Sequence, residues 1–223
     1  MDGSIPVVRT LSVADPVGLR RFVYPLLVLL LMITHTPLQA QSSATILCLG
    51  DSLTAGYGVP AEASYPALLQ DRLRKEGHAH QVINAGVSGD TTAGGLRRLE
   101  WLLRSKPAIA IVALGANDGL RGLNLQEMKQ NLTEIIHRLQ QAGVRPILAG
   151  IRIPPNYGRS YGEQFAAVYT ELAQEKGIAF IPFLLERVAT RPELNQEDGI
   201  HPNAAGYRQV LENVWPVLLP LLP

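Results

Sequence analysis

At 223 residues the chain is long enough for one sizeable domain, and no linker or internal repeat divides it. Its 20 Lys and Arg residues nearly balance 19 Asp and Glu residues, so no excess of basic charge indicates nucleic acid or an anionic membrane as the main partner. The single cysteine, Cys48, excludes an intrachain disulfide. Its place in an apolar run predicts a buried packing role.

The first forty residues have the layout of a secretory signal peptide. Arg20 and Arg21 precede the apolar run Phe22 to Ile33, and a polar stretch then leads to a cleavage site after Ala40. A run of twelve residues is too short to span a bilayer comfortably. An uncleaved anchor stays open as an alternative, because Leu38 is larger than the residue usually found three positions before the cut.

We therefore expect residues 1–40 to be a signal peptide and residues 41–223 to form a single domain. The mature protein is expected to be periplasmic or secreted, to be a monomer, and to have no stable membrane insertion after cleavage.

Short apolar runs alternate with segments of helical spacing along the rest of the chain. Five runs predict strands: Thr45 to Leu49, Val82-Ile83, Ile109 to Leu114, Ile147 to Ile151 and Ala179 to Phe183. Four segments predict helices: Tyr65 to Glu76, Leu125 to Ala142, Tyr161 to Lys176 and Ala204 to Leu219. Because a parallel crossover needs a connection of helix length, this alternation predicts a three-layer α/β/α sandwich with a parallel sheet.

Polar and glycine residues follow the predicted strands. In an open parallel sheet the ligand crevice lies beyond the carboxyl ends of the strands, so these segments should converge on one site. They are Gly50-Asp51-Ser52, Asn84-Ala85-Gly86, Gly115-Ala116-Asn117-Asp118 and Arg152-Ile153-Pro154-Pro155.

Ser52, at the end of the first strand, is a candidate nucleophile, and such a serine needs a base and a group that orients the base. The segment from Asp198 to His201 offers both within one turn. The Asp198 carboxylate can fold back onto Nδ1 of His201 and leave Nε2 facing outward. Taken alone, each of these residues is also an ordinary turn or helix-entry residue.

A tetrahedral intermediate needs hydrogen-bond donors aimed at its oxyanion. Gly86, just beyond the second strand, can offer a backbone N–H, and Asn117, just beyond the third, can offer a side-chain amide. The backbone N–H of Ser52 would be a third donor. Glycine and asparagine are common after strands, so the coincidence of all these groups in one domain carries the interpretation.

The sequence resembles the SGNH hydrolases, also called the GDSL family. The resemblance covers residues 45–219 and rests on four blocks, which span Gly50 to Gly58, Asn84 to Gly95, Gly115 to Asp118, and Asp198 to Pro202. The segments Asn117 to Gly122 and Ile153 to Gly158 are similar to those of the bacterial periplasmic group of multifunctional thioesterase I, lysophospholipase L1 and arylesterase enzymes.

This resemblance implies a flavodoxin-like sheet of five parallel strands and a serine hydrolase acting on carboxylic esters and thioesters. It implies Ser52 as nucleophile, His201 as base and Asp198 as orienting acid, with Ser52, Gly86 and Asn117 as oxyanion donors. It also implies small-molecule or lipid ester substrates, with no metal, no cofactor and no nucleic acid. His78 and His80 could suggest a metal pair, but no carboxylate or cysteine is arranged around them in the sequence.

Residues that could line an acyl groove are Leu120, Ile153, Pro154 and Tyr157, although each could equally pack in the core. Two further functions stay open on the same scaffold: an acetyl esterase acting on acetylated carbohydrates, and a non-catalytic lipid-binding protein.

Overall fold

The computed structural model describes residues 1–4 and 44–222. The predicted signal peptide and its cleavage site lie outside these residues, apart from residues 1–4, which are exposed and have no regular secondary structure. No helix within the described ranges is long and apolar enough to cross a membrane. Residues 44–222 lie in one compact unit.

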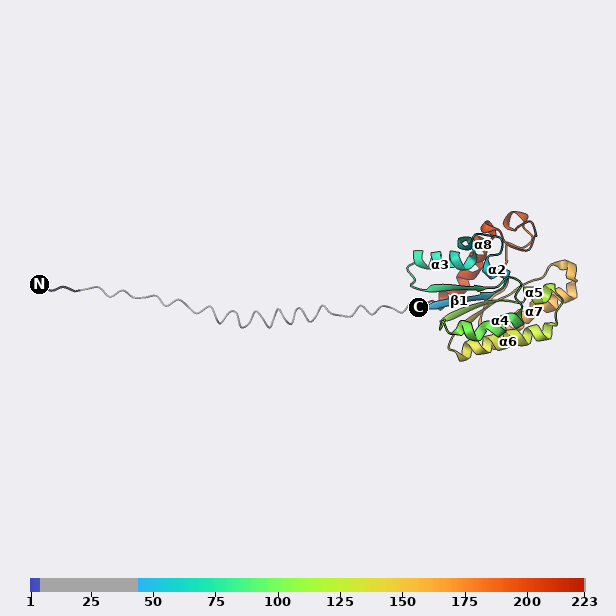
Figure 1. Ribbon diagram of the computed structural model, residues 1–223, viewed down its shortest axis with the longest axis horizontal. Coiled ribbons are helices and arrows are strands. Elements are labelled where there is room, and N and C mark those ends of the chain that lie inside the picture. Colours follow the sequence, from blue (N-terminus) through green and yellow to red (C-terminus); the bar gives the residue numbers. More distant parts are fainter. Residues whose placement is uncertain (5–43, 223) are drawn as a thin grey trace. The chain divides into compact units, whose positions relative to one another are not determined.

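A sheet of five parallel strands forms the middle layer of this unit (Figure 1), as predicted. Its strand order is β2-β1-β3-β4-β5. The strands are β1 (Thr45–Gly50), β2 (Gln81–Gly86), β3 (Ile109–Ala113), β4 (Arg145–Ala149) and β5 (Ala179–Ile181). The order reverses between β1 and β3, so the ends of these strands form the switch point where such sheets bind ligands.

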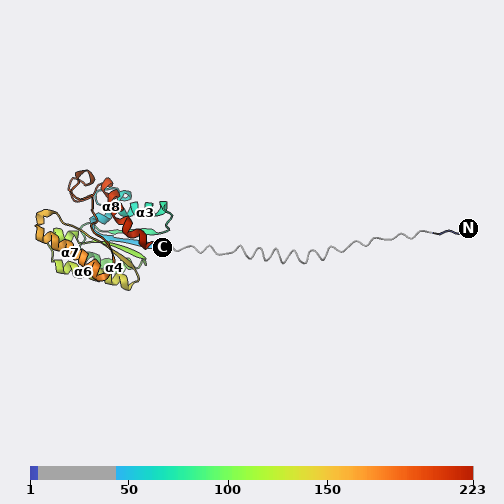
Figure 2. The same ribbon diagram turned by 180° about the vertical axis from the view of Figure 1, so that it is seen from behind.

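Helices cover both faces of the sheet, and Figures 1 and 2 show the same division from opposite sides. One face carries α3 (Tyr65–Lys75) and α8 (Ala204–Leu218), and the other carries α4 (Thr92–Leu103), α6 (Leu125–Gln141) and α7 (Arg159–Lys176). Two short helices, α2 (Ser52–Ala55) and α5 (Ala116–Leu120), follow β1 and β3 directly. The three-layer α/β/α architecture is therefore confirmed.

The core lies between the sheet and these helices. Every residue of β3 and all but the first of β1 are buried, which is the pattern of central strands covered on both faces. On α6 the buried side chains recur at helical spacing: Met128, Leu132, Ile135, Ile136 and Leu139. Asn124 caps this helix by accepting hydrogen bonds from the backbone N–H groups of Gln126 and Glu127.

Helix α4 was not predicted from the sequence. Its first turn contains Gly94 and Gly95, and each glycine costs a helix about 1 kcal/mol relative to alanine. The structure shows why they are there: a Cβ on Gly94 would collide with the Asp90 carboxylate, and one on Gly95 with Leu114. Close packing at this position therefore overrides helix propensity.

All five strands differ from their predicted bounds, β1 and β3 by only one residue each. β2 is six residues long rather than two. All six of its residues pair with β1, including the polar residues of β2. β4 ends at Ala149 rather than Ile151, and β5 ends at Ile181, directly before Pro182. Proline lacks the N–H that would continue the ladder, so an apolar run through Pro182 overestimates the strand.

Candidate active site

Ser52 lies where β1 turns into the four-residue helix α2. Asp51 caps this helix by accepting a hydrogen bond from the Leu53 N–H at 3.0 Å. Gly56, at φ 83°, ends it and donates its N–H to the Ser52 carbonyl. Gly50 permits the sharp turn, because a Cβ there would collide with Thr54. The nucleophile candidate is thus held by backbone that is fixed on both sides.

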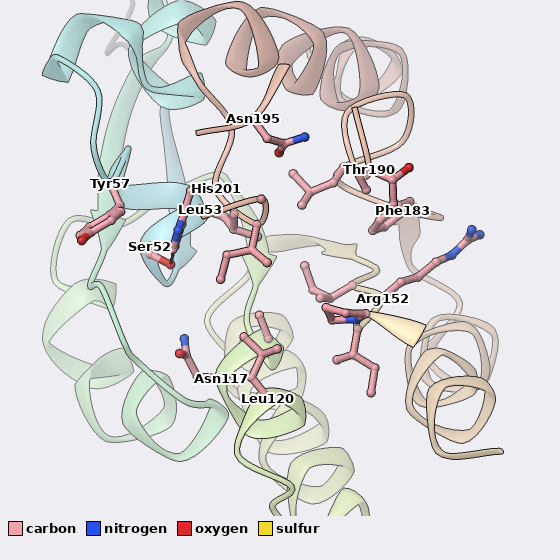
Figure 3. A pocket seen from close by; sticks show the side chains of 18 of the residues that line it. Ser52, Leu53, Tyr57, Asn117, Leu120, Arg152, Phe183, Thr190, Asn195 and His201 are labelled. Atoms are coloured by element: carbon pink, nitrogen blue, oxygen red, sulfur yellow. Dashed lines mark hydrogen bonds between the residues drawn. The ribbon is translucent and has the colours of Figure 1, made fainter. Parts of the chain in front are cut away.

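His201 and Asp198 complete a hydrogen-bonded chain with this serine, and Figure 3 shows the part of it between Ser52 and His201. His201 Nε2 lies 2.9 Å from Ser52 Oγ, and His201 Nδ1 lies 2.6 Å from Asp198 Oδ2. Because an ionised carboxylate only accepts, the Nδ1 proton donates to Asp198, and Nε2 is left to accept from Ser52. The three predicted triad residues are therefore brought together in the order that proton transfer from the serine requires.

The second oxygen of Asp198 fixes the carboxylate in this position. Oδ1 accepts backbone hydrogen bonds from Ile200 and His201, both at 3.0 Å. Burial alone would raise the pKa of Asp198, but the hydrogen bonds from these N–H groups and from the His201 ring outweigh it, and the net pKa is lowered. The acid is therefore ionised at neutral pH and able to orient the imidazole.

The loop that carries His201 is tied to the first block by Gln196. Its Nε2 donates to the carbonyls of Tyr57 at 2.7 Å and Pro202 at 2.9 Å, and its N–H donates to the His201 carbonyl. The Tyr57 ring lies beside the imidazole, with 4.7 Å between ring centroids. Sequence reasoning missed Tyr57 and Gln196, since their partners are more than 130 residues away.

Asn117 is the second residue of α5, and Figure 3 shows its side chain pointing toward Ser52. Its Nδ2 donates one hydrogen bond to the Asp90 carbonyl at 2.9 Å. An amide nitrogen has two protons, so this bond orients the side chain and leaves the second proton for a ligand. The N–H of Ser52, in the first turn of α2, has no partner inside that helix.

Gly86 does not offer the predicted third donor, and this corrects the sequence interpretation. Its N–H donates to Asn84 Oδ1 at 3.0 Å, and a Cβ on Gly86 would collide with the backbone of Ala55. Gly86 is therefore needed for close packing against α2. Gly89, three residues later at φ 80°, lines the cavity beside Ser52 instead, and within the described part of the chain its N–H makes no hydrogen bond.

A cavity of about 580 Å³ opens beside Ser52 and His201, which is a size typical of sites for small organic ligands. Most of its wall is apolar and comes from α2, from α5 and from the segments that follow β4 and β5: Leu53, Ala116, Leu120, Ile151, Ile153, Pro154, Pro155, Phe183 and Leu185. Figure 3 shows Leu120 and Phe183 on opposite sides of it.

Three of the four residues predicted to bind substrate line this cavity, namely Leu120, Ile153 and Pro154. Tyr157 does not. Its hydroxyl donates to the Leu120 carbonyl at 3.0 Å, and its side chain is 37% exposed. Tyr157 therefore supports the cavity wall from outside, because the hydrogen bond fixes the backbone that carries Leu120.

The histidine pair considered as a metal site and the single cysteine both lie within the described residues. His78 and His80 lie with their rings 6.1 Å apart, and nowhere in residues 1–4 and 44–222 do three or more potential ligands gather as a metal site would require. Cys48 is fully buried, and burial raises the pKa of its thiol to about 12. A thiol in this environment is unreactive.

Comparison with known proteins places this geometry in a family. The GDSL-like Lipase/Acylhydrolase family matches residues 48–209. The chain belongs to this family. It is 45% identical over 185 residues to Esterase TesA from Pseudomonas aeruginosa, covering 82% of the chain and 92% of the relative. The same identity over 166 residues links it to Thioesterase 1/protease 1/lysophospholipase L1 from Escherichia coli K12, covering 74% of the chain and 78% of the relative.

A solved structure agrees with this assignment. The crystal structure of TesA superposes with a TM-score of 0.78 at 46% identity, covering 80% of the chain and 99% of the TesA chain. The resemblance to the GDSL family, the fold that it implied and the prediction of an ester hydrolase are confirmed.

In this GDSL hydrolase, Asp51 is a buried acid outside the triad. Its Oδ2 has no hydrogen-bond partner among the described residues. Burial raises the pKa of Asp51 from 3.8 to about 7. The folded state therefore holds this proton more tightly than the unfolded state, and stability is lost as the pH rises through this window.

Replacing the acid, as Asp51→Asn, should remove this dependence. The free energy of unfolding of the variant minus that of the wild type should increase by up to about 2 kcal/mol between pH 5.5 and 8.5. Urea unfolding at both pH values measures the difference. Glu62→Gln, at an exposed site, is the matched control and should show no such change. Equal pH dependence of Asp51→Asn and the wild type would contradict the assignment.

Proposed function

We propose that this hydrolase cleaves fatty acyl esters and thioesters through an acyl-enzyme on Ser52. The observation that supports the proposal best is the hydrogen-bonded chain Ser52–His201–Asp198 at the mouth of a largely apolar cavity of about 580 Å³. A relative named as an esterase and another named as a thioesterase and lysophospholipase match most of the chain. Small-molecule or lipid esters are accordingly the proposed substrates.

The proposed reaction has two displacements. His201 Nε2 removes the Ser52 proton as Oγ attacks the carbonyl carbon, and the carbonyl oxygen becomes an oxyanion. When this intermediate collapses, the C–O or C–S bond breaks, and the leaving alcohol or thiol takes the proton from His201. A water molecule then gives its proton to His201 and attacks the acyl-enzyme, which releases the acid and returns the proton to Ser52.

The proposed oxyanion donors are the backbone N–H groups of Ser52 and Gly89 and the side-chain amide of Asn117. Gly89 takes the place that sequence reasoning gave to Gly86, because the Gly86 N–H is already used by Asn84. Donors held in place before the reaction stabilise the charge as it develops, since they need no reorganisation.

Acyl-chain preference tests the proposed substrate class. Each buried methylene contributes about 0.8 kcal/mol, so kcat/KM for p-nitrophenyl esters should rise by at least roughly 10-fold from acetyl to octanoyl. The matching acyl thioesters should follow the same order. A maximum at acetyl would favour an esterase of acetylated carbohydrates, and retention of the ester without turnover would favour lipid binding alone. Either outcome would contradict the proposal.

We further propose that the mature protein is a periplasmic or secreted monomer that does not act on nucleic acid. The support is the sequence of the first forty residues and the near balance of charge. In such a compartment cytosolic acyl-CoA is out of reach, so lipid or exogenous esters are the proposed natural substrates.

A further inference from the structure

Arg98, on the middle of α4, makes three short contacts below the catalytic loops. Its Nε lies 2.8 Å from Asp90 Oδ2. Its two terminal nitrogens donate to the Ala85 carbonyl at 2.7 Å and to the Gly50 carbonyl at 2.9 Å. The side chain is 22% exposed, and that of Asp90 is 12% exposed. One guanidinium therefore joins the end of β1, the end of β2 and the loop before α4.

Two of these partners, Gly50 and Asp90, lie close in the sequence to a proposed oxyanion donor. Gly50 is two residues before Ser52, and Asp90 directly follows Gly89. The carbonyl of Asp90 also accepts the bond from Asn117 Nδ2 at 2.9 Å. Asp90 is thus held by Arg98 through its side chain and holds Asn117 through its backbone.

The Asp90 carboxylate is closely surrounded by its neighbours. Its Oδ1 accepts the Thr91 N–H at 3.1 Å, and Gly94 leaves room for the carboxylate where any Cβ would collide with it. The two glycines that weaken α4 as a helix thus include one that permits this ion pair. Gly94 thus lowers the stability of α4 as a helix, but it makes room for the ion pair between Asp90 and Arg98 beside the proposed oxyanion site.

We propose that Arg98 is a positioning residue for the oxyanion site. It sets the backbone of Ser52 and Gly89 and, through Asp90, the amide of Asn117, without touching the substrate. The inference rests on the proposed function, in particular on these three groups as donors. It adds a fourth residue, 46 positions beyond the nucleophile in the sequence, on which the geometry of the oxyanion site depends.

The chemistry of the contact requires arginine. A guanidinium is planar and presents five N–H donors in a fixed fork, so it can reach one carboxylate and two carbonyls at once. A lysine ammonium would keep the charge beside Asp90 but could not hold both carbonyls in the same geometry. The charge itself also matters, because an unpaired Asp90 carboxylate would oppose a developing oxyanion nearby.

The test compares Arg98→Lys and Arg98→Met with the wild type in ester hydrolysis. We expect kcat to fall by roughly 10- to 100-fold, since small misplacements of catalytic groups have effects of this size, while KM changes less than about 3-fold. Labelling by a fluorophosphonate should slow in parallel. Arg97→Met is the matched control: the neighbouring arginine is exposed and should leave kcat within about 2-fold.

Coupling to Asn117 separates positioning from a purely structural role. Asn117→Ala alone should lower kcat by roughly 10²–10³-fold. If Arg98 acts through that amide, adding Arg98→Lys to Asn117→Ala should cost clearly less than it costs in the wild type. A full, multiplicative loss, a change in KM alone, or normal kcat in Arg98→Lys would overturn the inference.

Two controls keep the outcomes distinguishable. Circular dichroism and the thermal midpoint report folding, and Arg98→Lys carries the test if Arg98→Met does not fold. Ser52→Ala is assayed in parallel. If Ser52→Ala is inactive and Arg98→Lys is normal, only the inference about Arg98 fails, whereas an active Ser52→Ala would overturn the proposed function itself.

Discussion

Ser52→Ala should abolish covalent labelling by a fluorophosphonate and reduce ester turnover by at least about 10⁴-fold, because within residues 44–222 no other hydroxyl is hydrogen-bonded to the imidazole of His201. The His201 Nε2 contact at 2.9 Å is made to Ser52 Oγ, so removing that oxygen removes both the nucleophile and the proton that the base accepts. Gel fluorescence after labelling and a steady-state ester assay measure the two effects.

The fold of this variant should be retained. Ser52 contributes its backbone carbonyl to the turn, where it accepts from Gly56, and alanine preserves that bond. Ser160→Ala, at an exposed serine of α7, is the matched control and should label like the wild type. Labelling that persists in a folded Ser52→Ala protein would show that another residue is the nucleophile.

The order of elements was readable from the sequence because periodicity and burial agree in this protein. All five strands and the four longer predicted helices are present. The rule that ligands bind beyond the carboxyl ends of parallel strands correctly brought Ser52, Asn117 and the Ile153 segment to one cavity. The contact between the proposed triad acid and base was also predicted, since Asp198 and His201 are close in the sequence and need only one turn to meet.

The oxyanion loop was not fully readable, for a physical reason. Sequence position suggests the glycine at the strand end, but Gly86 is used for the close approach of α2, and its N–H is taken by Asn84. The available glycine, Gly89, lies one turn further on at positive φ. Only the pattern Ser88-Gly89-Asp90 could have indicated it, as a second turn-forming glycine in the same block.

The long-range contacts of Arg98 and Gln196 could not be predicted from the sequence. Arg98 reaches back 48 residues to Gly50, and Gln196 reaches back 139 residues to Tyr57. The local sequence around Arg98 or Gln196 does not indicate that either residue holds a distant segment in place, because an arginine on a helix and a glutamine in a loop are usually solvated. Local pattern therefore identifies groups that do the chemistry, while the residues that hold those groups appear only in three dimensions.

Asp198→Asn should retain the fold yet lower kcat by roughly 10³–10⁴-fold. Asparagine can keep the two backbone hydrogen bonds that Oδ1 accepts from Ile200 and His201, but it presents an NH₂ group where Oδ2 faced Nδ1. The imidazole then accepts at Nδ1 and carries its proton on Nε2, so it can no longer take the Ser52 proton. Steady-state kinetics and circular dichroism measure both statements, with Glu197→Gln, at the exposed neighbouring acid, as the control expected to stay within about 2-fold. Near-normal turnover in Asp198→Asn would assign the orientation of His201 to the Tyr57 and Gln196 contacts instead.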